Sequence, residues 1–270
     1  GKSQVAGTEA SCQISEMGFW AFQVDTLFMS FFLGLCMITV FRKIAKNATS
    51  KQPSRSQNIF EYLVTFVREQ VTENFTASKN PIMGPLALTI FTWVLLMNLM
   101  DLLPVDLVPW ALNGFTAPGA EGGAIHYFKV LPVADINAPI GMALGVLILI
   151  HYYSIKNKGL GGFLAELTFQ PYGKWMAPIN VIFEIPGFYA KQLALGLRLY
   201  GNLFAGEMIF ILIALFFSGF FDSFTGVLTG VAGIALNFIW AVFHILVVVL
   251  QAFLFMVLTL VYLQQAHEHH

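Results

Sequence analysis

Residues 223–266 read SFTGVLTGVAGIALNFIWAVFHILVVVLQAFLFMVLTLVYLQQA and contain no Asp, Glu, Lys or Arg. A bilayer core requires roughly 20 apolar residues in a helix, so this stretch is long enough to cross a membrane. Four more apolar stretches precede it, at 26–41, 82–108, 136–155 and 176–218. The pattern predicts an all-α polytopic membrane protein with five membrane helices, forming a single membrane domain over residues 1–270.

The composition supports this class. Hydrophobic residues make up 57% of the chain and charged residues only 11%, against roughly 25% charged residues in soluble domains. The net charge of −1 argues against a nucleic-acid partner, because surfaces that bind nucleic acid are basic. Neither a Gly-rich nucleotide-binding loop nor an H-E-x-x-H motif occurs. We therefore expect no catalytic residue, no metal site and no cofactor in this chain.

The last two stretches are too long to stand upright in a bilayer. About forty residues at ~1.5 Å each span roughly 60 Å, about twice the ~30 Å hydrocarbon thickness. We expect both helices to be strongly tilted or bent. The candidate flex points are Pro186, Gly201, Gly206 and Gly219.

The basic residues predict the orientation. Five of them follow the first span without an acidic neighbour: Arg42, Lys43, Lys46, Lys51 and Arg55. Because cytoplasmic loops are enriched in Lys and Arg, this segment is expected to be cytoplasmic. The N-terminal segment 1–24 then lies outside, which is the periplasmic side if the membrane is a bacterial inner membrane, and five spans return the C-terminus to the cytoplasm.

Three further segments carry local predictions. Residues 59–76 place apolar side chains at helical spacing, which predicts an amphipathic helix on the cytoplasmic membrane surface; a loop helix packed on protein is the alternative. Gly159, Gly161 and Gly162 are expected to loosen the connection after the third span. The terminal residues 267–270, His-Glu-His-His, are expected to form a frayed tail and not a metal site.

Polar side chains interrupt the fourth stretch: Glu184, Lys191, Arg198, Asn202 and Glu207. A charge at the membrane centre costs at least ~2.5–3.5 kcal/mol, so such residues face protein or water and mark ion pathways. Arg198 is the strongest candidate, because its immediate neighbours are apolar and give it no short route to water. Since a guanidinium does not titrate in proteins, Arg198 is expected to be a barrier to protons and not a relay.

Steps of seven residues separate the members of two polar stripes, Glu184, Lys191 and Arg198 on one helix and Asn237, His244 and Gln251 on the next. Each step drifts only ~20° around a straight helix. If the two helices are antiparallel, Gln251 approaches Arg198 and Asn237 lies toward the outside. Glu207, nine residues past Arg198, points to the opposite face of its helix unless the helix bends.

Simpler interpretations remain open for each of these residues. Glu184 could be a solvated boundary residue, and Lys191 could reach the cytoplasmic interface. His244 could be a packing histidine, and Arg198 could form a structural ion pair. The amides of Asn202, Asn237 and Gln251 could hydrogen-bond between helices, as such side chains commonly do in membranes.

Three segments, in this order, resemble subunit a of F-type ATP synthases: FTWVLLMNLMDLLP at 91–104, LRLYGNLFAGE at 197–207, and WAVFHIL at 240–246, running on to QAF at 251–253. The resemblance covers roughly residues 20–265. It is closest to the proteobacterial branch, which pairs Glu at position 207 with His at position 244. One departure is Gln192-Leu193-Ala194 after the lysine, where relatives of this branch tend to have Pro and then a small hydroxyl residue.

This resemblance implies a membrane stator of the bacterial inner membrane that works with a rotating c-subunit ring, the peripheral-stalk b subunits, the rest of the synthase and membrane lipid. It implies that Arg198 faces the ring carboxylates and separates two aqueous half-channels. The outer path then has Asn202, Glu207, His244 and Gln251, with Asn98 and Asp101 nearby. Glu184 belongs to the inner path, and Lys191 matches a polar family position.

Two other classes of protein are considered. A stand-alone proton-coupled secondary transporter with Arg198 as its substrate-binding charge should show an internal repeat, and none is visible across the five stretches. A membrane enzyme should cluster a nucleophile or a metal set, whereas the polar residues here are dispersed along two helices.

Overall fold

The computed structural model describes residues 24–49, 53–75, 80–102, 131–169, 177–217 and 224–267. Its elements in chain order are α2 (Val24–Lys46), α3 (Arg55–Asn74), α4 (Met83–Leu99), η1 (Met100–Leu102), η2 (Pro132–Ala134), α6 (Asn137–Phe169), α7 (Ala177–Ala214), η4 (Leu215–Phe217) and α8 (Phe224–His267). Five helices, α2, α4, α6, α7 and α8, are long and apolar enough to cross a membrane. The predicted all-α polytopic class is therefore confirmed.

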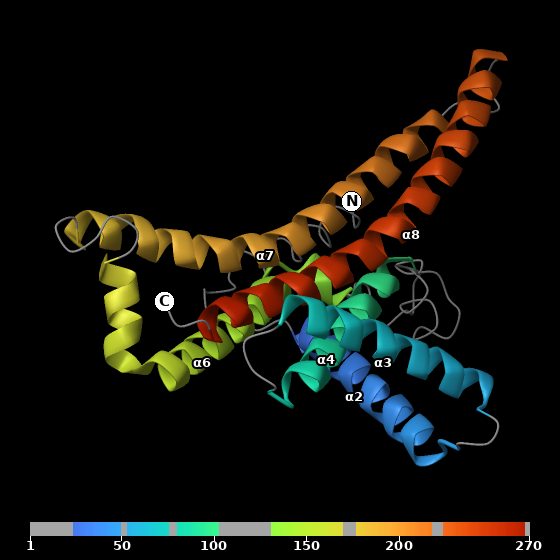
Figure 1. Cartoon of the computed structure of the whole chain (residues 1–270). Coiled ribbons are helices and arrows are strands. Elements are labelled where there is room, and N and C mark those ends of the chain that lie inside the picture. The colour runs from blue at the N-terminus through green and yellow to red at the C-terminus, as the bar shows by residue number, and fades with distance from the viewer. Residues whose placement is uncertain are drawn as a thin grey trace.

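The two long helices are α7 and α8. They contain 38 and 44 residues, which corresponds to roughly 57 and 66 Å. Figure 1 shows both helices curving, and the C-terminal half of α7 running beside the N-terminal half of α8 beyond the other described helices. Pro186 lies inside α7 without ending it. Gly219 and the turn between the helices lie outside the described residues.

Helices α2 and α4 end at residues other than those predicted. Helix α2 continues past residue 41 to Lys46, because basic residues in a last turn are favourable at the negative end of the helix dipole. Helix α4 ends at Leu99 and continues only as the short turn η1. The predicted residues 103–108, and most of the N-terminal segment 1–24, lie outside the described residues.

Helix α6 does not end near residue 155 but extends to Phe169 across a kink. Gly159 has φ 72° and ψ 163°, a conformation that glycine adopts without steric cost. Helical structure resumes directly after it, so Gly161 and Gly162 are helical and the predicted loose connection is wrong at these two positions. Figure 1 shows the second segment of α6 turning toward the N-terminal end of α7.

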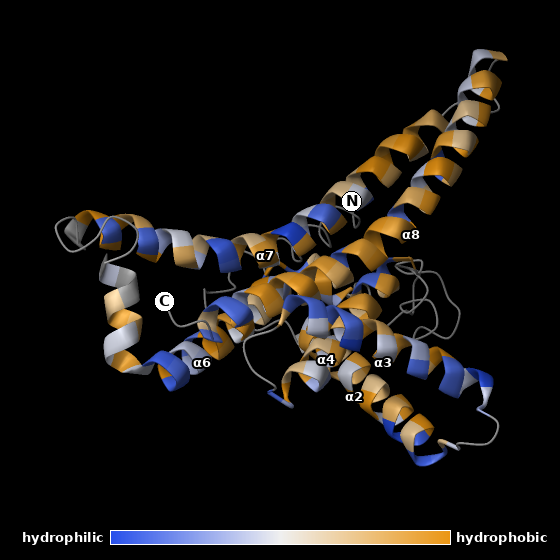
Figure 2. Ribbon diagram, in the orientation of Figure 1, coloured by the Kyte–Doolittle hydropathy of each residue, from blue (hydrophilic) through white to orange (hydrophobic). Residues whose placement is uncertain are grey.

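The core lies where α4, α6, α7 and α8 meet. Its largest fully buried hydrophobic side chains on α4 and α8 are Met83, Val94, Met97, Met256, Leu260 and Leu263. Helix α7 approaches α6 closely at Gly196, where a Cβ would lie 2.8 Å from the carbonyl oxygen of Pro139. The outer faces are apolar over much of α2, α7 and α8 (Figure 2), as expected for helices that contact lipid.

Helix α3 packs on protein through its apolar face. Its N-terminus is capped by Ser54, whose Oγ accepts a hydrogen bond from the backbone N–H of Gln57 at 3.3 Å. Val67 is 2% exposed, and the Phe66 ring lies 5.9 Å from the rings of both Phe91 on α4 and Phe253 on α8. These contacts favour the alternative of a helix packed on protein, while its place relative to the membrane stays a prediction.

Candidate functional site

A histidine and an aspartate from distant parts of the chain form a close pair. Nε2 of His244 on α8 lies 2.6 Å from Oδ2 of Asp101 on η1, 143 residues away in sequence. The two side chains are only 5% and 8% exposed. An ionised carboxylate can only accept, so with Asp101 ionised the imidazole N–H is the donor. The sequence predicted both residues as site residues but did not pair them.

A glycine makes room for this pair. A Cβ at Gly206 on α7 would lie 2.6 Å from Cε1 and 2.9 Å from Nδ1 of His244, closer than side-chain carbons pack. The Phe210 ring, one turn further along α7, meets the imidazole edge-to-face at 5.5 Å. Helix α7 therefore holds the His244 ring through Gly206 and Phe210, while Asp101 contacts the ring at Nε2.

The His244–Asp101 pair borders a small cavity, the His244 hollow, of about 20 Å³. Its polar lining residues come from α4, η1, α7 and α8, and its apolar lining residues from α7 and α8: Asn98, Asp101, Asn202, His244, Gln251, Leu199, Leu203, Val247 and Val248. A water molecule needs roughly 10–15 Å³ of such space, so the hollow has room for about one. Asn98 is 4% exposed and its Oδ1 has no hydrogen-bond partner among the described residues.

Glu207 lies beside this pair. It is half-buried on α7 and close enough to interact electrostatically with both Asp101 and His244. Arg198, by contrast, is exposed. The structure therefore separates Glu207 from the face of Arg198, as the nine-residue spacing predicts for a helix without a sharp bend.

A second cavity, the Glu184 hollow, lies further toward the N-terminal end of α7. It encloses about 100 Å³. Its lining residues come from α6, from α7 and from the C-terminal end of α8: Ile150, Ser154, Lys158, Phe163, Glu184, Phe188, Lys191, Gln192, Tyr262, Gln265 and Ala266. Lys158 closes the contact between α6 and α8, because its Nζ donates to the carbonyl oxygen of Gln265 at 3.1 Å.

Arg198 lies on α7 between the two hollows. The Glu184 hollow uses α7 up to Gln192, and the His244 hollow uses it from Leu199 onward, so the two share no lining residue. On the buried face of this interval Leu195 and Leu199 are 3% and 2% exposed. Within the described ranges, no ion pair joins Arg198 to a carboxylate. The guanidinium is therefore available to a group outside this part of the chain.

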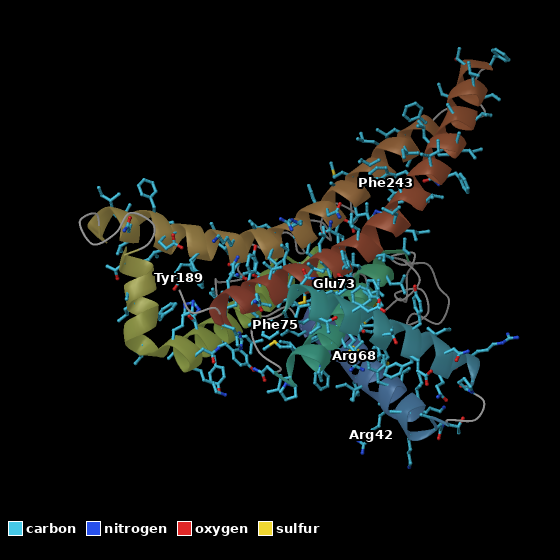
Figure 3. The ribbon with its side chains drawn as sticks, in the orientation of Figure 1. Arg42, Arg68, Glu73, Phe75, Tyr189 and Phe243 are labelled. Atoms are coloured by element: carbon cyan, nitrogen blue, oxygen red, sulfur yellow. The ribbon has the colours of Figure 1, made fainter. Side chains whose placement is uncertain are left out.

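The structure assigns the residues of the two predicted polar stripes to different places. Glu184 and Lys191 line one hollow, Asn202, His244 and Gln251 line the other, and Asn237 is exposed and lines neither. Figure 3 shows Phe243 where α7 and α8 extend beyond the other helices, and Asn237 lies six residues closer to their turn. In this extension α8 packs on α7 and on the short turn η4, and Asn237 stays exposed, so the spacing alone did not bring Asn237 into the site.

Sequence reasoning missed four polar residues of the Glu184 hollow, which come from α6, from α7 and from the C-terminal end of α8. These residues are Ser154, Lys158, Gln192 and Gln265, and their sequence signal is only a polar side chain within or at the end of an apolar stretch.

His267 is not frayed, contrary to the prediction. Its ring lies 5.0 Å from the rings of both Phe75 and Tyr153, and its Nδ1 lies 2.7 Å from the carbonyl oxygen of Leu263. Figure 3 shows Phe75 beside this end of α8. The prediction failed because these ring partners are remote in sequence. Residues 268–270 lie outside the described residues.

Long apolar helices that enclose two polar hollows on either side of an exposed arginine define a multi-pass membrane transport protein. The chain belongs to the ATP synthase A chain family, whose profile matches residues 27–264. Members of this family form the non-catalytic membrane subunit of the F-type synthase, so the nucleotide chemistry is carried by other subunits. Across the described ranges, no group of three His, Cys, Asp or Glu side chains could hold a metal ion.

Individual relatives match almost the whole chain. ATP synthase subunit a 2 of Hahella chejuensis is 52% identical over 258 residues, covering 96% of this chain and 87% of the relative. ATP synthase subunit a of Marinomonas sp. is 50% identical over 260 residues, with the same coverage of 96% and 87%. The subunit a of Colwellia psychrerythraea is 50% identical over 254 residues, covering 94% and 91%. These similarities confirm the resemblance to the proteobacterial branch.

Proposed function

We propose that this chain is the stator through which protons cross the membrane sector of a rotary ATP synthase, exchanging with the carboxylates of a rotating c-subunit ring. The observation that carries the proposal is the position of Arg198, exposed on α7 between two polar hollows that share no lining residue. A path that must load a proton on one side and release it on the other requires such an interruption.

The permanent positive charge of arginine suits a barrier between the two hollows. A guanidinium remains protonated in proteins, so Arg198 attracts an ionised ring carboxylate and cannot carry its proton onward. Its repulsion of other cations keeps protons in the two hollows from exchanging directly. Leu195 and Leu199, both buried, support the same separation on the inner face of α7.

The proton route follows from the residues of each hollow. A proton enters from the periplasm past Glu207 and the His244–Asp101 pair, with Asn98, Asn202 and Gln251 holding water beside them, and neutralises a ring carboxylate. The neutral carboxyl group rotates into lipid, since it no longer has the desolvation cost of a charge. A carboxyl group that returns from lipid meets Arg198 and loses its proton toward Glu184, Lys191 and the cytoplasm.

The energy source is the membrane potential together with the proton gradient. Moving one charge through 100 mV releases ~2.3 kcal/mol, and ring rotation transmits this energy to the nucleotide-binding subunits. In the reverse direction, ATP hydrolysis drives proton pumping.

The exposed surface of α7 suits a ring of apolar helices. Between residues 193 and 208, Arg198 is the one exposed charged residue, and the large exposed side chains are apolar: Leu193, Leu197, Phe204 and Met208. A partner with apolar helices and one carboxylate per helix complements this surface. Lipid and the b subunits cover other apolar faces, such as that of α2, in an orientation with the N-terminus periplasmic and the C-terminus cytoplasmic.

The test is ATP-driven acidification of inverted membrane vesicles that carry the assembled synthase with Arg198→Ala. The matched control is Ile182→Ala, at an exposed position of the same helix outside the proposed ring surface. We expect normal assembly and abolished pumping for the arginine variant only. Pumping near the wild-type level by an assembled Arg198→Ala complex would refute the proposed role.

A further inference from the structure

The Glu184 hollow contains a buried amide whose acceptor is unused. Gln192 is 4% exposed, and its Oε1 has no hydrogen-bond partner among the described residues. A buried acceptor without a donor is costly, and such groups in proteins are usually satisfied by protein or by ordered water. Gln192 lines a cavity of about 100 Å³, several times the space that one water molecule needs. Water can therefore supply the missing donor.

The position of Gln192 on α7 is close to the point where protons are exchanged. It precedes Arg198 by six residues, about 9 Å along a helix axis, and the residues between them are Leu193, Ala194, Leu195, Gly196 and Leu197. Gln192 is thus the polar side chain of the hollow that lies nearest to Arg198 along α7. Past it, on the buried face of the helix, Leu195 is 3% exposed and does not line the hollow.

The charges around the hollow explain why an amide suits this place. Lys158 and Lys191 are cations, and Glu184 is the one carboxylate among the lining residues. A glutamine amide neither gains nor loses a proton near neutral pH. Its oxygen can orient a water molecule without competing with Glu184 for the proton that passes.

We infer that Gln192 is a positioning residue of the Glu184 hollow, whose Oε1 accepts a hydrogen bond from a water molecule that relays protons between the Arg198 side of α7 and the Glu184 carboxylate. The water accepts the incoming proton on a lone pair and releases another of its O–H protons toward Glu184, so the amide is unchanged. The relay rests on the proposed function, whereas the presence of water at Gln192 does not.

The first measurement is passive proton flux through the membrane sector in vesicles stripped of the catalytic head. Gln192→Leu removes the acceptor at similar volume, while Gln192→Asn keeps an uncharged amide acceptor on a side chain that is one methylene shorter. Ile148→Met, at an exposed position of α6 outside the hollow and outside the proposed ring surface, is the control. We expect Gln192→Leu to slow the flux about tenfold, the equivalent of one lost hydrogen bond. Gln192→Asn should retain most of the flux although it fills less volume than leucine, which a purely structural role for the side chain does not predict.

The second measurement does not depend on transport. In a background with Cys12→Ala and Cys36→Ala, the Gln192→Cys variant of the assembled complex is treated with a small water-soluble thiol reagent, beside Leu195→Cys as the dry control. We expect labelling at position 192 only. Absence of labelling there means that no water reaches Gln192 and overturns the inference, whatever Arg198 does.

The two measurements also separate the inference from the proposed function. Labelling at position 192, with flux unchanged by Gln192→Leu and abolished by Arg198→Ala, would leave the proposed function standing and overturn the relay. Equal loss of flux in Gln192→Leu and Gln192→Asn would likewise overturn the relay in favour of a packing role.

Discussion

Nε2 of His244 lies 2.6 Å from Oδ2 of Asp101, and the two residues are 143 positions apart in the chain. The pair joins the middle of α8 to the turn that ends α4, at the border of the His244 hollow. Both side chains are almost completely buried, so each depends on the other for its polar contact. This dependence leads to the first prediction.

Asp101→Asn and His244→Gln should not have additive effects. Each single variant removes the same charge-assisted contact, so the double variant is expected to lose little more proton flux than the more damaging single variant. Residues in direct contact commonly show interaction free energies of roughly 0.5–3 kcal/mol in such cycles. Passive proton flux in stripped vesicles, measured for the four proteins of the cycle, gives this value. Additive losses would mean that the two residues act independently.

Gly206→Ala should disturb the His244–Asp101 pair although neither residue of the pair is replaced. The new methyl group would lie 2.6 Å from Cε1 of His244, so the imidazole must move relative to Asp101 or α7 must move away from α8. We expect a clear loss of ATP-driven acidification in assembled complexes. Gly201→Ala is the matched control, because nothing lies within 4 Å of its added Cβ. Equal effects of the two substitutions would argue against this explanation.

Gly196→Ala should weaken the contact between α6 and α7. Its Cβ would lie 2.8 Å from the carbonyl oxygen of Pro139, and a backbone atom cannot rotate away as a side chain can. Overpacking of this kind typically costs about 1–3 kcal/mol. We expect a lower melting temperature of the purified protein in detergent. Gly187→Ala, which meets nothing within 4 Å, should leave that temperature nearly unchanged.

His267→Ala should loosen the C-terminal end of α8. The substitution removes ring contacts with Phe75 and Tyr153, each at 5.0 Å, and aromatic pairs contribute about 0.5–1.5 kcal/mol each. Faster amide hydrogen exchange in the last turns of α8 would report the loosening. His267→Phe keeps the ring contacts and should restore most of the protection; failure to do so would assign the effect to the hydrogen bond from Nδ1 to Leu263.

The helices and their polar stripes could be predicted from the sequence, because hydropathy and helical period are local properties. The uncharged run 223–266 is long enough to require a tilted or bent helix in any bilayer. The seven-residue steps from Glu184 to Arg198 restrict these side chains to one side of α7 wherever that helix lies. The apolar spacing in 59–76 likewise predicted the face of α3 that is buried.

The division of these stripes into two hollows came only from the tertiary structure. It depends on which helix covers which part of α7 and α8: η1 brings Asp101 to His244, while α6 and the end of α8 bring Lys158 and Gln265 to Gln192. Asn237 has the same spacing from His244 as Gln251 but is left exposed, because α7 and α8 extend there beyond the other described helices. Helical period sets the direction of a side chain from its own axis, and only packing between segments distant in sequence decides what it meets.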